Sequence, residues 1–274
     1  MAEEQKQVAE QEEAEQRSAP SGKIVYKAIL KEGEEELSRP SSALFWSGLA
    51  AGLSMGFSMI AEGLLAAYLP DAPWRPLVSK FGYSAGFLVV ILGRQQLFTE
   101  NTLTPILPLL QRKDGATAGN VLRLWVIVLV ANLVGALLVA LVAARTNAFD
   151  PHVRDAFAQI GNKAMEHGFA TVLLRGVFAG WLIALMVWLL PFAESARVWV
   201  IIFITYIVGL GNFSHIIAGS VETFTLAAMG QKSWLIVLGG FVVPTLIGNI
   251  LGGVTLVATL NHAQVVAGGG GQDI

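Results

Sequence analysis

Residues 198–229 read VWVIIFITYIVGLGNFSHIIAGSVETFTLAAM and indicate the fold more clearly than any other part of the chain. An apolar run of 13 residues ends before Gly211, and a polar sequence up to His215 interrupts it before a second apolar run begins at Ile216. A helix that crosses the hydrocarbon core of a bilayer needs about 20 apolar residues. We therefore interpret this stretch as one membrane span that is broken into two half-helices. Irregular backbone survives at that depth only where protein buries it or where it lines a polar cavity.

The composition of the chain supports a membrane protein. Hydrophobic residues make up 54% of the 274 residues and charged residues 14%, whereas soluble domains carry about 25% charged residues. The first 40 residues hold 16 of the 38 charged side chains. We therefore expect three regions: a charged tail (1–40) that is solvated and partly helical or disordered, a six-span membrane domain (41–262) and a flexible C-terminal tail (263–274). The acidic N-terminus lacks the basic and then apolar pattern of a signal peptide.

Six apolar segments follow one another in the body of the chain. Four of them are long enough to span, at residues 43–69, 124–144, 169–190 and 235–260. The second segment is interrupted like the fifth, because its apolar run 81–92 stops at Gly93-Arg94-Gln95-Gln96 and a second run follows at 103–110. We expect discontinuous second and fifth helices, each in the middle of a set of three.

Short matches between the two sets of three indicate an internal repeat. The pattern G-x-x-A-G occurs at 48–52 and 176–180, and N-x-x-G occurs at 132–135 and 249–252. Three spans are an odd number, so the second copy must enter the membrane from the opposite face. We therefore predict an all-α integral membrane protein with six transmembrane helices in two inverted three-helix repeats. Broken helices in such a repeat point to a substrate path near the bilayer midplane.

The basic residues indicate an orientation. With the N-terminus inside, eight Lys and Arg residues from Lys23 onward lie in the segments on the cytoplasmic side and six lie on the other side. By the positive-inside rule, this distribution favours cytoplasmic N- and C-termini.

His215 is the only histidine within a predicted span. An imidazole titrates near neutral pH, so it can donate a hydrogen bond to an anion or relay a proton. The alternative is a buried neutral histidine that is bonded to a backbone carbonyl. An ionisable side chain beside a broken intramembrane helix is a candidate functional residue, and we favour a role for His215 in the substrate path.

The other break contains residues 97–102, LFTENT. Leu97 and Phe98 suit a dewetted constriction, while Thr99 offers a hydroxyl beside exposed backbone amides. The alternative is a polar linker in which Thr99 or Asn101 caps the second half-helix. We favour the substrate path because this position mirrors that of His215.

Arg94 adjoins the same break, and its guanidinium stays charged at any relevant pH. It must either face the pore, where it would attract anions, or pair with an acid. The acids in the same spans are Glu62, Glu100 and Glu222, and we favour pairing, which would lock the loop at the break. Glu222 lies seven residues after His215, hence on one helical face with it. For Glu62 and Glu222, a structural ion pair and a proton path are equal alternatives.

No motif indicates an enzyme. The sequence contains no G-x-x-x-x-G-K-[ST], H-E-x-x-H or G-x-S-x-G pattern, which are the signatures of phosphate loops, zinc proteases and nucleophile elbows. It has no cysteine and no acidic cluster with metal spacing, and its net charge of -2 includes no basic stripe for nucleic acid. We expect no cofactor, no metal and no nucleic-acid partner.

The chain resembles the formate/nitrite transporter family over about residues 41–260. The most specific matches are Leu97-Phe98-Thr99 at the first break, His215-Ile-Ile-Ala218 after Gly211 at the second, and Gly248-Asn249-Ile-Leu-Gly252 in the sixth segment. Residues 42–48, SALFWSG, further resemble the YfdC-like branch.

The resemblance implies an aquaporin-like fold and a homo-pentamer in which each protomer holds its own pore for small monovalent anions such as formate or nitrite. It also implies a multi-pass protein of the bacterial inner (cytoplasmic) membrane, surrounded by lipid, with cytoplasmic N- and C-termini. By the same resemblance, His215 is the central histidine and Thr99 belongs to the loop that gates the pore. Leu97 and Phe87 would line one constriction.

Other positions depart from the family pattern. Arg94 and Gln96 stand where formate-conducting members commonly have alanine and an acid. Val208 replaces an aromatic residue seven positions before the histidine, and Lys163 lies one residue out of register with a pore lysine of the third loop. The resemblance therefore implies the fold but not the substrate.

We expect a membrane channel or transporter for a small monovalent anion or its neutral acid, with proton coupling through His215. The expected substrate path consists of Phe87, Arg94, Leu97, Phe98, Thr99, Asn101, Lys163, Val208 and His215. Two alternatives stay open at this point. One is an aquaporin-like pore for water or a small neutral solute, and the other is a membrane scaffold or sensor that conducts nothing.

Overall fold

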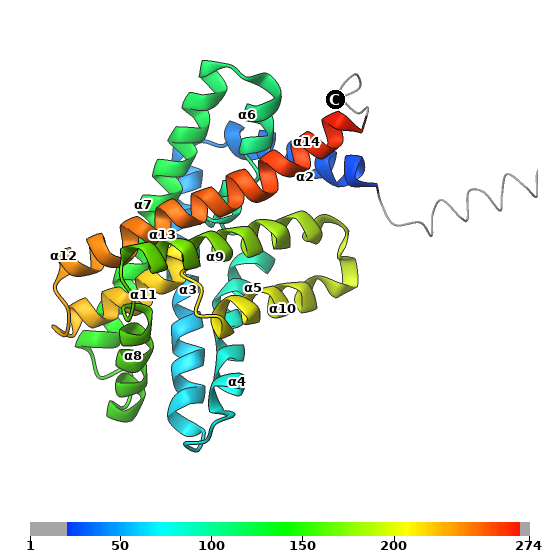
Figure 1. The fold of residues 1–274 in the computed structure, drawn as a ribbon. Helices are drawn as coiled ribbons and strands as arrows, with labels where there is room; N and C mark the ends of the chain where they lie inside the picture. The colour runs from blue at the N-terminus through cyan, green and yellow to red at the C-terminus, as the bar shows by residue number, and fades with distance from the viewer. Residues whose placement is uncertain (1–20, 269–274) are drawn as a thin grey trace, which may run out of the picture.

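The computed structural model describes residues 21–268, and every regular element within this range is a helix (Figure 1). The all-α prediction is therefore confirmed for the described residues. What the sequence predicts for residues 1–20 and 269–274 lies outside them.

Five helical segments in the described range are long and apolar enough to cross a membrane. Three of them consist mainly of one long helix: α3 (Ser41–Tyr68), α7 (Gly115–Arg145) and α9 (Phe169–Leu189), which the turn η3 (Leu190–Phe192) extends. Another is made of α4 (Arg75–Ser79), η1 (Lys80–Tyr83) and α5 (Ser84–Leu92). These segments agree with a multi-pass membrane protein.

The last of these segments, residues 234–267, is continuous but changes its winding. It runs through α12 (Trp234–Val237), the π-helical η5 (Leu238–Val242), α13 (Val243–Ile250), the π-helical η6 (Leu251–Thr259) and α14 (Leu260–Ala267). Outside the spans, α8 (Pro151–Ala164) follows α7, and the short turn η4 (Glu194–Ala196) follows η3.

The second and fifth predicted segments are broken where the sequence indicates. After α5 the chain leaves the helix at Gly93 and continues through the turn η2 (Glu100–Thr102) to α6 (Ile106–Arg112). Likewise α10 (Arg197–Leu210) ends at Gly211, and α11 (Ile216–Ala228) begins after an interruption. The residue after each glycine has a left-handed backbone, with φ of 51° at Arg94 and 47° at Asn212. Since side chains other than glycine rarely adopt this conformation, the two breaks share an unusual geometry.

A buried asparagine of α7 holds the first broken segment in place. The side-chain oxygen of Asn132 accepts the backbone N–H of Phe98 at 2.9 Å. Its side-chain nitrogen donates to the carbonyls of Gly48 in α3 and Gln96 in the break, at 2.7 and 2.9 Å. Backbone groups that leave a helix at membrane depth must be satisfied by protein. Asn132 satisfies two of them, the N–H of Phe98 and the carbonyl of Gln96, and its bond to Gly48 ties the break to α3.

Asn249 of α13 makes the corresponding set of bonds in the other half of the chain. Its side-chain oxygen accepts the N–H of Ile216 at 2.9 Å. Its side-chain nitrogen donates to the carbonyls of Gly176 in α9 and Ser214 in the break, both at 2.8 Å. Each asparagine therefore links one broken segment to the long helix that precedes it.

Glycines allow these helices to touch through their backbones. A Cβ atom at Gly52 would lie 2.2 Å from the carbonyl oxygen of Asn132, and one at Gly180 would lie 2.3 Å from that of Asn249. The G-x-x-A-G pattern is therefore a close-packing motif, in which small residues let two helices approach. It brings both asparagines within reach of the breaks.

The N-terminal region contains an ordered helix, α2 (Gly22–Ser38). Tyr26 and Ile29 on this helix are fully buried, and the Tyr26 hydroxyl is hydrogen-bonded to Nδ1 of His262 in α14 at 2.8 Å. The two helices lie side by side (Figure 1). Residues 22–38 are thus helical, but one face packs on the membrane domain instead of being solvated. At the other end, α14 continues through residues 263–267, which the sequence assigns to a flexible tail.

Candidate functional site

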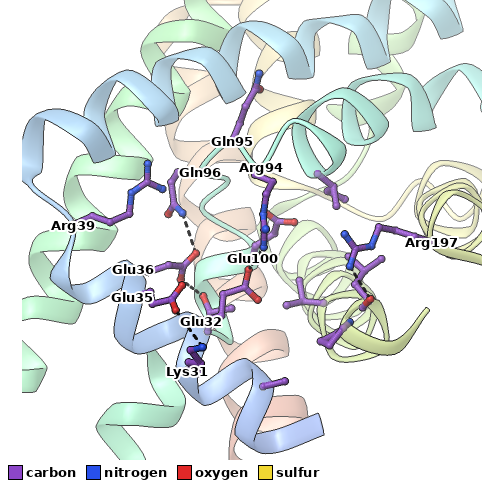
Figure 2. Close-up of a pocket in the computed structure, with 16 residues that line it drawn as sticks. Lys31, Glu32, Glu35, Glu36, Arg39, Arg94, Gln95, Gln96, Glu100 and Arg197 are labelled. Atoms are coloured by element: carbon purple, nitrogen blue, oxygen red, sulfur yellow. Dashed lines mark hydrogen bonds and ion pairs between the residues drawn. The ribbon is translucent and has the colours of Figure 1, made fainter. Parts of the chain in front are cut away.

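A cavity with a volume of about 730 Å³ lies between α2 and the segment that follows α5 (Figure 2). Its lining includes four basic residues, Lys31, Arg39, Arg94 and Arg197, and four acidic ones, Glu32, Glu35, Glu36 and Glu100. Within residues 21–268, no group of three or more His, Cys, Asp or Glu side chains could hold a metal ion. The cavity is therefore polar and charge-balanced.

A smaller cavity of about 30 Å³ lies beside the second break, with Lys80, Tyr83, Val208, His215 and Glu222 among its lining residues. Lys80 stands at the start of the helical run η1–α5, whereas Arg94 of the larger cavity follows its end. At 1.5 Å per residue, this run separates them by about 20 Å. The two cavities therefore lie toward opposite ends of the domain.

Thr99 and His215 connect the two broken segments. Oγ1 of Thr99 lies 2.8 Å from Nε2 of His215, and the residues are 0% and 1% exposed. Leu97 and Phe98 are buried next to Thr99 in the chain, and none of these three residues lines either cavity. Gln96 and Glu100, on either side of them in the chain, line the larger cavity, and His215 lines the smaller one, so the Thr99–His215 hydrogen bond lies between the two cavities. We call Leu97, Phe98 and this hydrogen bond the plug.

The second ring nitrogen of His215 caps α11. Nδ1 accepts the backbone N–H groups of Ile217 and Ala218, each at 3.2 Å. A neutral imidazole whose Nδ1 accepts has its proton on Nε2, so His215 donates to Thr99 and leaves the threonine hydroxyl free to donate onward. The alternative of a buried histidine bonded to a backbone carbonyl is wrong only in the partner: His215 is buried, but it bonds to two N–H groups and a hydroxyl.

Apolar side chains surround the imidazole. The ring of Phe87 in α5 meets it edge-on, with centroids 4.9 Å apart and an interplanar angle of 78°. Phe87 and Val208 are both fully buried, and Val208 lines the smaller cavity. Hydrogen bonds are stronger in such a poorly hydrated setting, and an unpaired polar group is more costly. The site therefore favours a ligand that can pair with the available donors.

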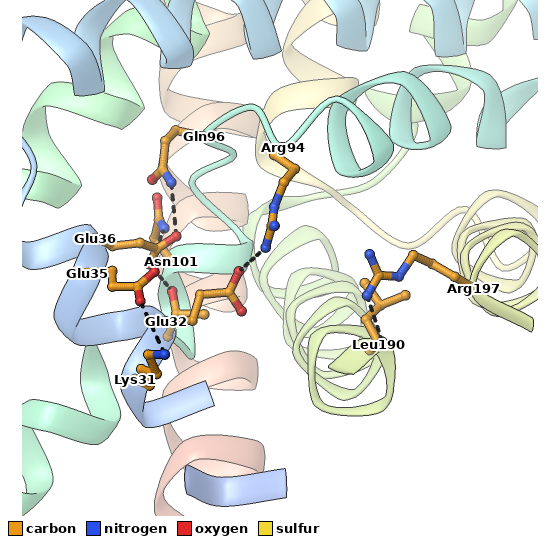
Figure 3. A network of polar contacts seen from close by, with 10 residues as sticks. Lys31, Glu32, Glu35, Glu36, Arg94, Gln96, Asn101, Leu190 and Arg197 are labelled. Carbon is orange, nitrogen blue, oxygen red and sulfur yellow. Dashed lines mark hydrogen bonds and ion pairs between the residues drawn. The ribbon is translucent and has the colours of Figure 1, made fainter. Parts of the chain in front are cut away.

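Glu36 of α2 fastens the N-terminal helix to the first break (Figure 3). Its carboxylate accepts Nε2 of Gln96 at 2.9 Å, Nδ2 of Asn101 at 3.2 Å, and the Thr104 hydroxyl. All three donor side chains are buried. Asn101 therefore binds Glu36 and does not cap the second half-helix, since α6 begins without a side-chain cap. Through these bonds α2 positions the loop that carries Thr99.

Burial raises the pKa of Glu36 from 4.5 to about 7, although the hydrogen bonds from Thr104 and Gln96 offset part of the rise. Nearby Glu32 adds to it by charge repulsion. The folded chain therefore binds this proton more tightly than the unfolded chain does. It follows that the contribution of Glu36 to stability is largest below about pH 4.5 and declines as the pH rises to about 7.

Glu36→Gln should remove this part of the pH dependence. Glutamine keeps an oxygen that accepts hydrogen bonds from the loop, but it does not ionise. Between about pH 5 and about pH 8, the melting temperature of the detergent-solubilised wild type should fall further than that of the variant. Glu34→Gln is the matched control, because Glu34 lies on the same helix and pairs with Arg112. Equal pH dependence of the melting temperature in the wild type and Glu36→Gln would contradict the role given to Glu36 in this decline.

Arg94 is paired, but not with any of the three acids that the sequence suggests. Its Nη2 lies 3.6 Å from Oε1 of Glu32 in α2, and its side chain is 80% exposed (Figure 2). Glu62, one of the expected partners, pairs with Lys80 instead. An exposed ion pair contributes about 0–1 kcal/mol. The prediction that Arg94 locks the loop is therefore wrong, and Arg94 lines the larger cavity.

Lys163 lies apart from the other candidate residues. It is near the end of α8, half-exposed, with its Nζ 3.1 Å from the carboxylate of Glu166. Its neighbours Ile160 and Ala164 line the smaller cavity, but Lys163 does not. The structure thus brings Phe87, Thr99 and His215 together and leaves Lys163 outside this group.

The sequence profile described as formate/nitrite transporter matches residues 23–263. The chain belongs to the formate/nitrite transporter family. Among its relatives, Inner membrane protein YfdC of Escherichia coli (strain K12) is 41% identical over 241 residues, which cover 88% of this chain and 78% of the relative. Formate channel BtFdhC of Bacillus thuringiensis is 23% identical over 234 residues, covering 82% and 88%.

Two solved structures share the fold of this formate/nitrite transporter family member. One, described as a pentameric formate channel with formate bound, has a TM-score of 0.70 at 18% identity and covers 82% of this chain and 98% of that chain. The other, described as an FNT family ion channel, has a TM-score of 0.75 at 19% identity, with coverages of 88% and 98%. At such low identities the likeness concerns the fold.

Thr99 and His215 form the central pair of this family member. The residues that support this pair carry weaker sequence signals. Asn132 is the only strongly polar residue in its apolar run, and Asn249 stands at the matching repeat position, so both could be found from the sequence. Glu36 could not, because it lies in the acidic run EGEEE at 32–36. Nothing local distinguishes it from Glu34 or Glu35.

Proposed function

We propose that this protein conducts a small monovalent anion, or the neutral acid formed from it, across the membrane. The observation that carries the proposal is the buried hydrogen bond between Thr99 and His215, which lies between two cavities at opposite ends of the domain. A solute that crosses must replace this bond. The donors that it then meets are Nε2–H of the imidazole and the threonine hydroxyl, and both suit an anion.

Apolar side chains on the path favour a solute that loses its charge in transit. Leu97, Phe98 and Phe87 are buried beside the central pair, and they offer an anion no compensation for its lost water. A weak acid lowers this cost when it takes up a proton and crosses as a neutral molecule. Formate and nitrite are suitable probes, because both are small weak-acid anions that appear in the family description.

The proposal includes an architecture of six spans in two inverted halves. The matched bonds of Asn132 and Asn249 and the left-handed residues after Gly93 and Gly211 support it. We further propose a homo-pentamer in a bacterial inner membrane with both termini in the cytoplasm. The fold of the pentameric formate channel, the name of the E. coli relative and the distribution of basic residues support these assignments.

Flux into proteoliposomes tests the function. Formate and nitrite should enter at least about tenfold faster than chloride or glycerol, and faster at about pH 5 than at about pH 8, because protons assist their passage. Empty liposomes and liposomes with Thr99→Val are the controls, since valine keeps the shape of threonine without its hydroxyl. Flux of water or glycerol without formate would instead support an aquaporin-like pore, and no flux at all would support a scaffold.

A further inference from the structure

The smaller cavity contains charged groups that the central pair does not explain. Lys80 of η1 and Glu222 of α11 both line it together with His215. Nζ of Lys80 lies 2.6 Å from Oε1 of Glu62, and the two side chains are only 16% and 4% exposed. A buried ion pair is costly unless its remaining polar atoms are satisfied. The cost of this pair therefore depends on whether the other carboxyl oxygens of the cluster, on Glu62 and Glu222, have partners.

Those oxygens lack partners. Oε2 of Glu62 is buried without a hydrogen bond. Glu222 is 8% exposed, and no described residue forms a hydrogen bond or an ion pair with its carboxyl group, although Lys80 and Glu62 lie within electrostatic range. Glu222 is therefore an unpartnered polar side chain, more than nine-tenths buried, on the wall of a cavity.

The net charge of Lys80, Glu62 and Glu222 depends on how many of the two carboxyl groups are protonated. One ammonium group, that of Lys80, stands against two carboxyl groups, so the cluster is neutral when one carboxyl group is protonated. Two buried carboxylates close together cannot both ionise without a large penalty. Since Glu62 contacts Lys80 directly, the proton belongs on Glu222. The wall of the cavity thus carries a carboxylic acid whose proton has no other acceptor among the described residues.

Few other groups at the cavity could exchange that proton. Besides Lys80 and Glu222, the titratable residues that line it are Tyr83 and His215. Helices α8 and α10 and the π-helical η5 contribute apolar side chains, namely Ile160, Ala164, Val208 and Phe241. The imidazole already uses both of its nitrogens. Glu222 is therefore the acid best placed to meet a solute in this cavity.

We infer that Glu222 is the residue that gives a proton to the anion, and takes it back from the neutral acid, at this mouth of the pore. The inference rests on the proposed function. As an anion such as formate enters, the O–H bond of Glu222 breaks and a new O–H bond forms on a formate oxygen, which yields formic acid and a Glu222 carboxylate. Lys80, which it shares with Glu62, offsets only part of the charge of this carboxylate, so the carboxylate soon takes a proton back from water at the mouth. A volume of about 30 Å³ corresponds to about one water molecule, so an entering solute must contact this wall.

In this scheme Lys80 and Glu62 are positioning residues. Lys80 stabilises the carboxylate after the proton has left, and Glu62 keeps Lys80 from binding Glu222 permanently. His215 remains a hydrogen-bond donor at the plug and is not required to give up its proton. The smaller cavity is then where the solute changes its charge, and the plug at Thr99 is where it crosses as a neutral molecule.

Proteoliposomes that contain Glu222→Gln test the inference, with formate as the external probe and a trapped pH dye to follow proton entry. We expect formate uptake at about pH 5 to fall by at least about tenfold and its pH dependence to disappear. Glu222→Asp should restore the pH dependence, because it restores the acid. Glu166→Gln is the matched control, since Glu166 is half-exposed and outside both cavities. It should behave like the wild type.

The outcomes separate the two proposals. If the wild type carries neither formate nor nitrite, the proposed function fails and this inference fails with it. If the wild type carries formate and an assembled Glu222→Gln variant keeps its rate and pH profile, only the inference is overturned. Should Glu222→Gln not assemble, Lys80→Gln replaces it. That variant leaves two carboxyl groups without a cation, so proton release and pH-dependent uptake should be lost, and unchanged uptake overturns the inference.

Discussion

Replacing His215 with alanine should lower formate flux by about 10- to 100-fold, since a hydrogen bond to a charged group contributes about 1.5–3 kcal/mol. The imidazole is the buried donor nearest to the plug, and it is joined to Thr99 at 2.8 Å. Without it, a solute that reaches this point, as the anion or as its neutral acid, has lost water and gains one donor fewer. Initial uptake rates of labelled formate, measured at several pH values, give the size of the effect.

The alanine variant also loses the cap of α11, because Nδ1 of His215 accepts two backbone N–H groups. Loss of an N-cap costs about 1 kcal/mol. His215→Asn separates the two roles, since an asparagine side chain is a good cap but carries no imidazole. The asparagine variant should keep a melting temperature close to that of the wild type while its flux falls like that of the alanine variant. Wild-type flux in His215→Asn would refute a direct role for the imidazole.

Replacing Asn132 or Asn249 with alanine should give the largest loss of stability in the chain. Each substitution leaves one backbone N–H and one carbonyl group of the break without a partner, in positions where water is scarce, and removes the bond that ties the break to the preceding long helix. Each orphaned group costs about 1–3 kcal/mol. We expect a large fall in melting temperature in detergent and little assembled protein, measured by fluorescence-monitored unfolding and size-exclusion chromatography.

A matched control for this pair is Asn162→Ala. Asn162 is exposed on α8, where its side chain donates to the carbonyl of Ala158 in its own helix and to the exposed side chain of Gln231. Its loss should leave the melting temperature almost unchanged. Because Asn132 and Asn249 make corresponding bonds, their alanine variants should be destabilised to a similar extent. Wild-type stability in either variant would show that its three bonds are not needed to hold the break.

The local sequence largely determines where the chain spans the membrane and where it breaks. The lengths of the apolar runs indicate the spans, because a bilayer core of about 30 Å requires about 20 helical residues. The breaks at Gly93 and Gly211 are equally local, since a glycine followed by polar residues interrupts both runs. The repeat motifs around Asn132 and Asn249 indicated which segments correspond, and the hydrogen bonds of these two residues follow that correspondence.

Only part of the candidate site could be predicted from the local sequence. Thr99 and His215 were indicated by their mirrored positions at the two breaks, and the structure joins them directly. Their roles as donor and acceptor were not indicated, because these depend on which atoms surround the imidazole. The alternative reading gave His215 a carbonyl partner, but Nδ1 instead accepts N–H groups of its own helix, a consequence of where α11 begins.

The partners of the charged residues were settled by packing. A sequence shows that a buried charge must find a partner, because leaving it unpaired in a membrane is costly. It does not show which opposite charge the fold brings within about 4 Å. Arg94 meets Glu32 because α2 packs beside the first break, and Glu62 meets Lys80 because α3 packs against η1. Apolar periodicity and glycines along the chain therefore specify the spans and breaks, while contacts between distant helices specify which polar atoms meet.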